Sequence, residues 1–99
     1  MNRKPSTLVH NGRILLVDGD AAVQASVGGR LRRDGLEVMA ARSAAHAMDC
    51  LCAGHFDLVI ADANTQDQAG LELLRRARQI DPNIVFILTA DGGNIASAV

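Results

Sequence analysis

Short apolar runs alternate with longer segments of helical periodicity along most of the chain. A continuous apolar run is typical of a strand that is buried on both faces of a sheet. Three such runs occur, RILLV (13–17), FDLVIA (56–61) and IVFIL (84–88). A further segment, LEVMAA (36–41), alternates in the manner of a short, half-buried strand. The pattern therefore predicts four strands.

Helical periodicity predicts three helices between these strands, over residues 20–34, 44–53 and 69–79. Gly35 is placed to end the first helix and Ser43 to cap the second. The side chains expected to face inward are Val23, Val27 and Leu31 in the first helix, Ala44, Ala47, Met48 and Leu51 in the second, and Leu71, Leu74 and Ile80 in the third.

Strict alternation of strands and helices with short connections predicts a single α/β domain with a parallel sheet covered on both faces. The polar residues 1–12 are expected to form a loose leader, and the domain to span 13–99. After IVFIL, Asn94 is expected to cap a last helix of which the sequence contains one turn.

The composition narrows the classes of function. A net charge of −1 gives no electrostatic reason to expect nucleic-acid binding, and no apolar run is long enough to cross a membrane. Cys50 and Cys52 have no second pair with which to form a zinc site, so we interpret them as reduced thiols. We therefore expect a soluble cytoplasmic protein, in which the histidines are solvated or packing residues rather than ligands: His10, His46 and His55.

Polar residues follow three of the predicted strands at the point where each strand ends. Asp18 and Asp20 follow the first, Asp62 follows FDLVIA, and Thr89 follows IVFIL. Parallel α/β sheets bind ligands at the carboxyl ends of their strands, and clustered carboxylates are hard oxygen ligands suited to Mg²⁺. Acids at strand ends are also ordinary turn formers, and Asp20 can simply cap the helix that follows it. Spacing alone leaves both interpretations open.

The segments ILLVDGD, FDLVIADANTQDQAGLELLRRAR and VFILTA resemble the CheY-like receiver domain of two-component response regulators, from Arg13 to Val99. The resemblance implies a flavodoxin-like, doubly wound, three-layer fold with strand order 2-1-3-4, in which the family's fifth strand and fifth helix are missing. It implies that Asp62 accepts a phosphoryl group from a histidine kinase or a phosphotransfer protein and that Thr89 is the switch residue. It also implies a Mg²⁺ site formed by Asp18, Asp20, Asp62 and the backbone carbonyl of Asn64.

The chain departs from the receiver pattern at several positions. Gly19 stands where the family has a second acid that ligates Mg²⁺, so weak Mg²⁺ binding is expected. Thr65 and Gln66 replace the usual apolar-proline pair after the phosphoacceptor. Without a fifth strand, the segment 84–88 would form an exposed apolar edge, which predicts a homodimer or a strand-exchanged oligomer.

Three functions follow from these features. The first is a phosphoacceptor signalling domain rather than an enzyme, with Mg²⁺ as cofactor. The second is a degenerate receiver that acts as a phosphorylation-independent interaction or dimerisation module, which Gly19 and the altered loop favour. The third is a small enzyme or flavin-binding domain on the same topology, because a fold does not determine a function. The absence of a glycine-rich phosphate loop after the first strand argues against the third.

Overall fold

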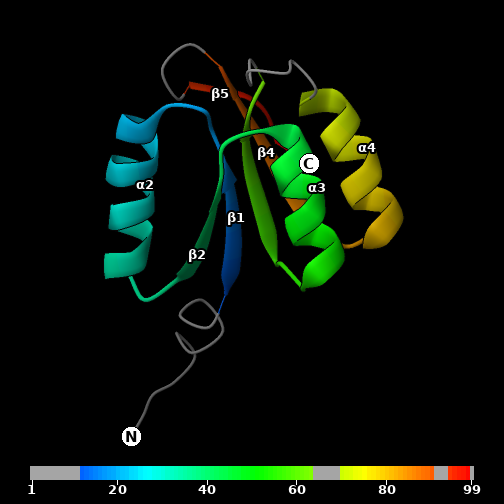
Figure 1. Ribbon diagram of the computed structural model, residues 1–99, viewed down its shortest axis with the longest axis horizontal. Helices are drawn as coiled ribbons and strands as arrows, with labels where there is room; N and C mark the ends of the chain where they lie inside the picture. The colour runs from blue at the N-terminus through cyan, green and yellow to red at the C-terminus, as the bar shows by residue number, and fades with distance from the viewer. Residues whose placement is uncertain (1–11, 64–69, 91–93, 99) are drawn as a thin grey trace, which may run out of the picture.

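The computed structural model describes residues 12–63, 70–90 and 94–98. Figure 1 shows a sheet of five strands with helices on both faces. The strands are β1 (Arg13–Val17), β2 (Glu37–Ala41), β3 (Leu58–Asp62), β4 (Val85–Ala90) and β5 (Asn94–Ala98). The described helices are α2 (Ala21–Arg33), α3 (Ala44–Ala53) and α4 (Gly70–Ile80). Among these residues, no helix is long and apolar enough to span a membrane.

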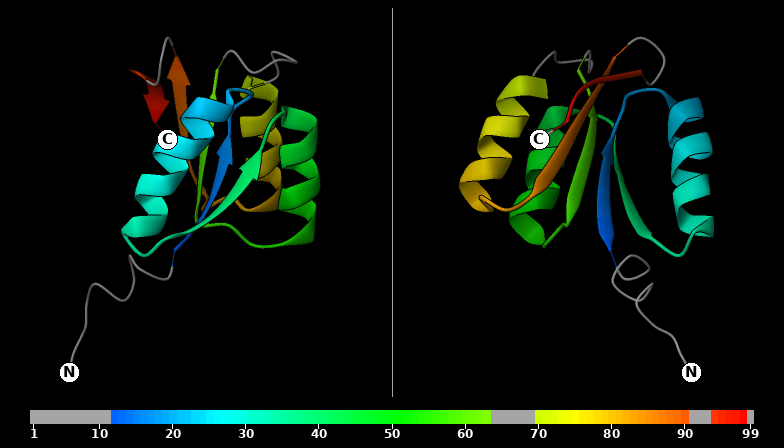
Figure 2. Two further views of the ribbon diagram at one scale, coloured as in Figure 1. Left: turned by 60° about the vertical axis from the view of Figure 1, so that its left-hand side comes forward. Right: turned by 180° about the vertical axis from the view of Figure 1, so that it is seen from behind.

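The sheet has the order β2-β1-β3-β4-β5, and its first four strands are parallel. Helices α3 and α4 cover one face and α2 lies on the other, which gives three layers (Figure 2). These observations confirm the predicted fold class and the order 2-1-3-4 of the parallel strands. The right-handed crossover between parallel strands explains why alternating elements produce this arrangement.

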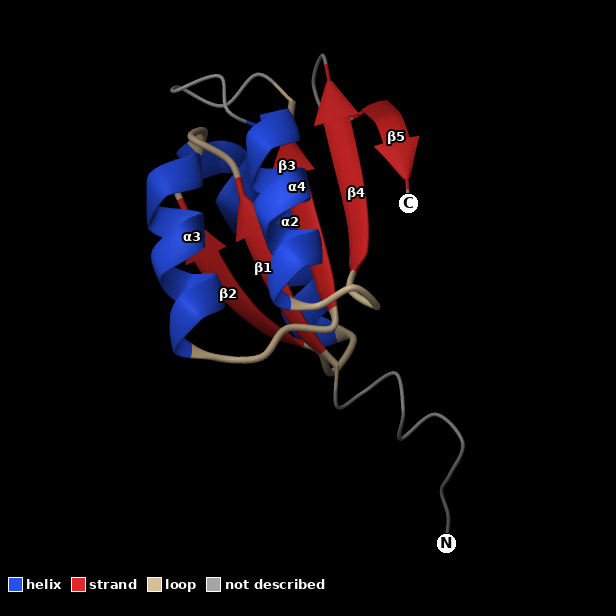
Figure 3. Ribbon diagram, turned by 90° about the vertical axis from the view of Figure 1, so that its right-hand side faces the viewer, coloured by secondary structure: helices blue, strands red, loops and turns tan. Residues whose placement is uncertain are grey.

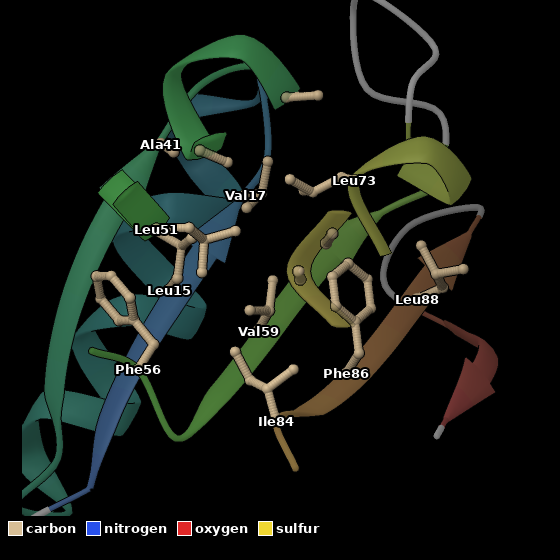
Figure 4. Packing of buried hydrophobic residues seen from close by; sticks show 14 residues of the cluster. Leu15, Val17, Ala41, Leu51, Phe56, Val59, Leu73, Ile84, Phe86 and Leu88 are labelled. Atoms are coloured by element: carbon tan, nitrogen blue, oxygen red, sulfur yellow. The ribbon is translucent and has the colours of Figure 1, made fainter. Parts of the chain in front are cut away.

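The main core lies between the sheet and helices α3 and α4 (Figure 4). Buried side chains of β1, β3 and β4 alternate toward this face, as the period of two in a strand requires. Helix α3 contributes the inward side chains predicted for it, since Ala44, Ala47 and Leu51 are buried and Met48 packs against the cluster. The core residues of the strands on this face are Leu15, Val17, Ala41, Val59, Ala61, Phe86 and Leu88.

The opposite face of the sheet is covered only in part. Under α2, Ile14 and Leu16 are almost fully buried. Four aliphatic side chains farther along the same face are only half-buried or exposed, and Val85 reaches 49% exposure. We call these four the β3–β4 strip: Leu58, Ile60, Val85 and Ile87.

The inward faces predicted for two of the helices are wrong in part. Val23 and Leu31 of α2 are half-buried and Leu74 of α4 packs against the core, as predicted, but other members of both faces are exposed. In α2, Val27 is exposed and Gly28 is the buried residue, which lets the helix approach Leu16. In α4, Leu71 and Ile80 are exposed, whereas the helix packs through Leu73 and Ala77. Leucines at three positions of one turn fit more than one helical phase, and packing against the sheet selects among them.

The predicted last helix is also wrong, because Asn94–Ala98 forms β5, antiparallel to β4 (Figure 3). A single turn of helix has too few residues to offset the cost of nucleation. The free edge of β4 instead offers unpaired N–H and C=O groups to the returning chain. The expectation of an exposed edge over 84–88 is therefore wrong at Ile87 and Leu88, which pair with β5.

Candidate functional site at the carboxyl edge of the sheet

The polar residues that follow the parallel strands meet at one edge of the sheet. Val17 pairs with Ala61 in the β1–β3 register, so Asp18 and Asp62 stand next to each other. Asp62 in turn pairs with Thr89 across β3 and β4. The structure thus brings together Asp18, Asp62 and Thr89, as the strand-end pattern predicts.

Asp18 is the one buried charged side chain among the described residues, with 8% exposure. Its N–H donates to the carbonyl of Ala41 at 2.9 Å, and its Oδ1 accepts from the N–H of Asp20 at 2.9 Å. Burial raises the pKa of the Asp18 carboxyl above its ordinary value; the hydrogen bond from Asp20 opposes this rise, whereas the charges of Asp62 and Asp20 add to it. Three acidic side chains, Asp18, Asp20 and Asp62, thus lie close enough at this edge to influence one another electrostatically.

Asp20 is exposed and serves as the N-cap of α2. Its side chain accepts a hydrogen bond from the N–H of Ala22 at 2.8 Å. This is the capping role that the sequence left open as an alternative. A role for Asp20 as a direct metal ligand stays a prediction.

Gly19 lies between the two acids in a backbone conformation that any L residue can adopt. Among the described residues, a Cβ added at this position would meet the carbonyl oxygen of Arg42 alone, at 3.5 Å, which is an ordinary van der Waals contact. The backbone therefore does not require glycine here, and the described residues leave room for a Cβ at position 19.

The donor set fits a hard cation, but it is incomplete. Within 12–63, 70–90 and 94–98, no three acidic, histidine or cysteine side chains are arranged to hold a metal ion together. Asp18 and Asp62 supply carboxylate oxygens, which Mg²⁺ prefers. Asn64, whose carbonyl is a predicted ligand, lies outside the described residues. Two adjacent carboxylates suit a weakly bound Mg²⁺.

Helix α4 approaches the site through Gly70. A Cβ at Gly70 would lie 3.3 Å from the Cα of Ala63, 3.3 Å from the carbonyl oxygen of Asp62 and 3.4 Å from Leu88 Cδ2. The N–H of Ala63 donates to the carbonyl of Thr89 at 2.7 Å and ties the ends of β3 and β4 together. The glycine at position 70 is therefore explained by close packing against the backbone that follows Asp62.

Two polar residues that the sequence did not single out hold the acid-bearing loop. Gln24 of α2 donates from Nε2 to the carbonyls of Leu16, Asp18 and Ala41, at 2.9, 3.1 and 3.1 Å. Arg42, after β2, donates from Nε and Nη2 to the carbonyl of Gly19, at 3.1 and 2.8 Å. A polar residue four positions after Asp20 in a packed helix is the one signal that could have pointed to Gln24.

The cysteines and His55 lie away from this edge, whereas His46 lies in the first turn of α3. Cys50 and Cys52 are free thiols, as expected. His46 is exposed, and exposed His55 contacts Asp57 at 3.2 Å. His10 lies outside the described residues.

Known proteins share this sequence pattern. The family model described as response regulator receiver domain matches residues 14–98. The transcriptional regulatory protein GlrR of Escherichia coli K12 is 31% identical over 99 residues, which is 100% of this chain and 21% of that protein. The sporulation initiation phosphotransferase F of Bacillus subtilis is 31% identical over 83 residues, 83% of this chain and 67% of that protein.

A solved structure agrees with these relatives. The response regulator TrrA of Thermotoga maritima, solved in complex with Mg²⁺ and BeF, has a TM-score of 0.75 and 28% identity, and the match covers 80% of this chain and 69% of that one. Fold and acidic edge together define a signalling domain of the two-component type. The chain belongs to the response regulator receiver domain family. It spans about a fifth of the length of GlrR.

Proposed function

We propose that Asp62 accepts a phosphoryl group from a phosphohistidine of a histidine kinase or a phosphotransfer protein. The position of Asp62 supports this: it ends β3 between buried Asp18 and Thr89, at the edge where parallel sheets bind ligands. Family membership supports the same role, because phosphoryl acceptance is the general function of receivers.

The transfer is a single displacement at phosphorus. An Asp62 carboxylate oxygen attacks phosphorus, and its O–P bond forms as the P–N bond of the phosphohistidine breaks. The electron pair of the P–N bond stays on the imidazole nitrogen, and Asp62 is left as an acyl phosphate. When bound, Mg²⁺ would supply positive charge that offsets the phosphoryl oxygens. Asp18, Asp62 and the Asn64 carbonyl would hold it, with Asp20 at the margin.

In this proposal, Thr89 responds to the new group. It pairs with Asp62 across β3 and β4, is half-buried, and also belongs to the segment that pairs with β5. In this proposal, the Thr89 hydroxyl donates to a phosphoryl oxygen on Asp62 and changes the partner-binding face beside β4.

The experiment is phosphorylation with a small donor. The chain is incubated with Mg²⁺ and acetyl phosphate, or with beryllofluoride, and followed by intact mass or NMR. We expect one adduct on the wild type, none on Asp62→Ala, and a normal adduct on Asp49→Ala, an acid of α3 away from the site that serves as the matched control. An adduct that persists in Asp62→Ala would contradict the proposal.

A degenerate receiver is the second candidate, and a specific observation favours it. Position 19 has no acid, and within the described parts of the chain no three-ligand site is formed. The same experiment separates the two functions, because a wild type that takes no adduct and binds no Mg²⁺ would act only by protein interaction.

A further inference from the structure

The loop that carries Asp18 and Asp20 is held from a neighbouring connection. The β1–α2 and β2–α3 connections lie side by side at the carboxyl end of the sheet (Figures 1 and 2). Arg42 extends from the second connection and places both Nε and Nη2 on the carbonyl oxygen of Gly19. A guanidinium that donates twice to one oxygen fixes both its distance and its direction.

The peptide group between Gly19 and Asp20 is bonded at both ends. Its carbonyl accepts from Arg42 at 2.8 and 3.1 Å, and its N–H donates to Asp18 Oδ1 at 2.9 Å. A cation on the carbonyl polarises the peptide and strengthens the hydrogen bond that its N–H makes. Arg42 therefore reaches the buried carboxylate of Asp18 through a single peptide group.

We propose that Arg42 is a positioning residue for the cation site, which orients the Asp18 carboxylate through the Gly19–Asp20 peptide. This inference rests on the proposed function, because it assigns Arg42 to the same site. Gly19 has no side chain with which to fix that peptide, so the orientation depends on the guanidinium. Gln24 holds the start of the same loop through the carbonyl of Asp18 and leaves the Gly19 carbonyl to Arg42.

The Coulombic effect of Arg42 has the opposite sign to its positioning effect. A cation near the acids repels Mg²⁺, so its removal for charge reasons alone would tighten Mg²⁺ binding. Loss of positioning would weaken it. Arg42→Lys separates the two effects, because lysine keeps the charge and loses the planar, two-donor geometry.

The test compares Arg42→Lys and Arg42→Ala with the wild type. The matched control is Arg33→Lys, because exposed Arg33 also donates to a glycine carbonyl, that of Gly29 at 3.4 Å, within α2 and away from the acids. Mg²⁺ affinity is measured by titration, and exchange of the Asp20 amide proton is measured by NMR without metal. Thermal melting reports any general loss of stability.

We expect Arg42→Lys to weaken Mg²⁺ binding about three- to tenfold, the effect of losing one well-placed hydrogen bond. Exchange of the Asp20 amide should accelerate by a similar factor, whereas melting and the control stay at wild-type values. Wild-type Mg²⁺ affinity and amide exchange in Arg42→Lys, or tighter binding in Arg42→Ala, would overturn the inference.

Failure of the proposed function is recognised separately. A wild type that neither binds Mg²⁺ nor takes an adduct refutes that function and, with it, the role of Arg42 in metal binding. Amide exchange in the metal-free chain still decides whether Arg42 holds the loop.

Discussion

At the scale of single residues, the site combines one well-buried acid with a neighbouring position that has no side chain. The N–H of Asp18 donates to the carbonyl of Ala41 at the end of β2, and its carboxylate accepts from the N–H of Asp20. Among the described residues, no side chain lies within 4 Å of where a Cβ on neighbouring Gly19 would stand. The weakness expected of the cation site therefore reflects a missing ligand at a position where the backbone is already suitable.

Gly19→Asp should tighten Mg²⁺ binding by on the order of tenfold, because a further carboxylate adds an oxygen ligand and negative charge. Within the part of the chain that the structure describes, the new Cβ meets just the Arg42 carbonyl oxygen, at 3.5 Å, so the Cβ fits without a clash there. Titration with Mg²⁺ measures the change, with Gly19→Asn as the control of similar shape and no charge. Unchanged affinity in Gly19→Asp would show that position 19 does not face the cation.

A second residue-scale prediction concerns Asp57, at the opposite end of the sheet. Asp57 Oδ2 accepts from the N–H of Arg13 at 2.8 Å, and this hydrogen bond, assisted by His55, holds the pKa of the Asp57 carboxyl below its ordinary value of 3.8. A depressed native pKa means that the unfolded chain binds the proton more readily. The stabilisation is therefore present above about pH 3.8 and is lost as the pH falls through the native pKa.

Asp57→Asn should accordingly lower the free energy of unfolding near pH 7 by less than about 1 kcal/mol, because the side chain is half-exposed and water screens its charge. The difference from the wild type should shrink below pH 3.8 and disappear once the pH has fallen through the native pKa, which lies below that value. Urea unfolding at several pH values measures this. A difference that stays constant with pH would mean that packing, not charge, is responsible.

At the scale of elements, three glycines in helices differ in how much space surrounds them. Gly29 lies inside α2, and a Cβ added there would meet no other described residue within 4 Å beyond its own helix backbone, whereas Gly28 approaches Leu16 and Gly70 approaches the backbone after Asp62. Glycine inside a helix costs about 0.5–1 kcal/mol relative to alanine. Among these three, only Gly29 allows this cost to be recovered without a steric penalty.

Gly29→Ala should therefore stabilise the chain by about 0.5–1 kcal/mol. Gly70→Ala should destabilise it by about 1 kcal/mol or more, because the added carbon presses on backbone atoms that the sheet holds in place. Chemical unfolding of the two variants beside the wild type tests both signs together. Equal shifts in the same direction would contradict this assignment.

The elements also show what the sequence could and could not predict. The buried strands were predictable because RILLV, FDLVIA and IVFIL are continuous apolar runs, and Asp18, Asp62 and Thr89 followed from their places at strand ends. The face of α4 that packs against the sheet was not predictable, because leucines at adjacent positions are compatible with more than one buried face. Arg42 and Gln24 donate to backbone carbonyls far away in the sequence, and such contacts leave no periodic signal.

At the scale of the whole molecule, β5 decides how the sheet ends. It pairs with β4 from Ile87 to Ala90 and satisfies backbone groups that an open edge would expose. The chain segment that was expected to begin a helix thus protects an apolar strand. The state of this edge should govern whether copies of the chain associate.

Removal of residues 91–99 should produce concentration-dependent association, because the full length of β4 becomes an unpaired apolar edge. Size-exclusion chromatography with light scattering at micromolar concentration measures this against the 99-residue chain. A truncated chain that stays in the same oligomeric state as the untruncated one would show that β5 does not protect the edge.

The unequal covering of the two sheet faces divides the molecule into parts of different local stability. Helices α3 and α4 share a closed core with the four parallel strands, whereas α2 lies over the β1–β2 side of the other face and leaves the β3–β4 strip partly exposed. Helix α2 also contains two interior glycines, so we expect it to detach at a lower free energy than α3 or α4. Asp18 and Asp20 connect α2 to the core of the sheet. The acidic loop is therefore the boundary between the part that unfolds locally first and the part that unfolds last, and a cation bound there would raise the free energy of that first opening.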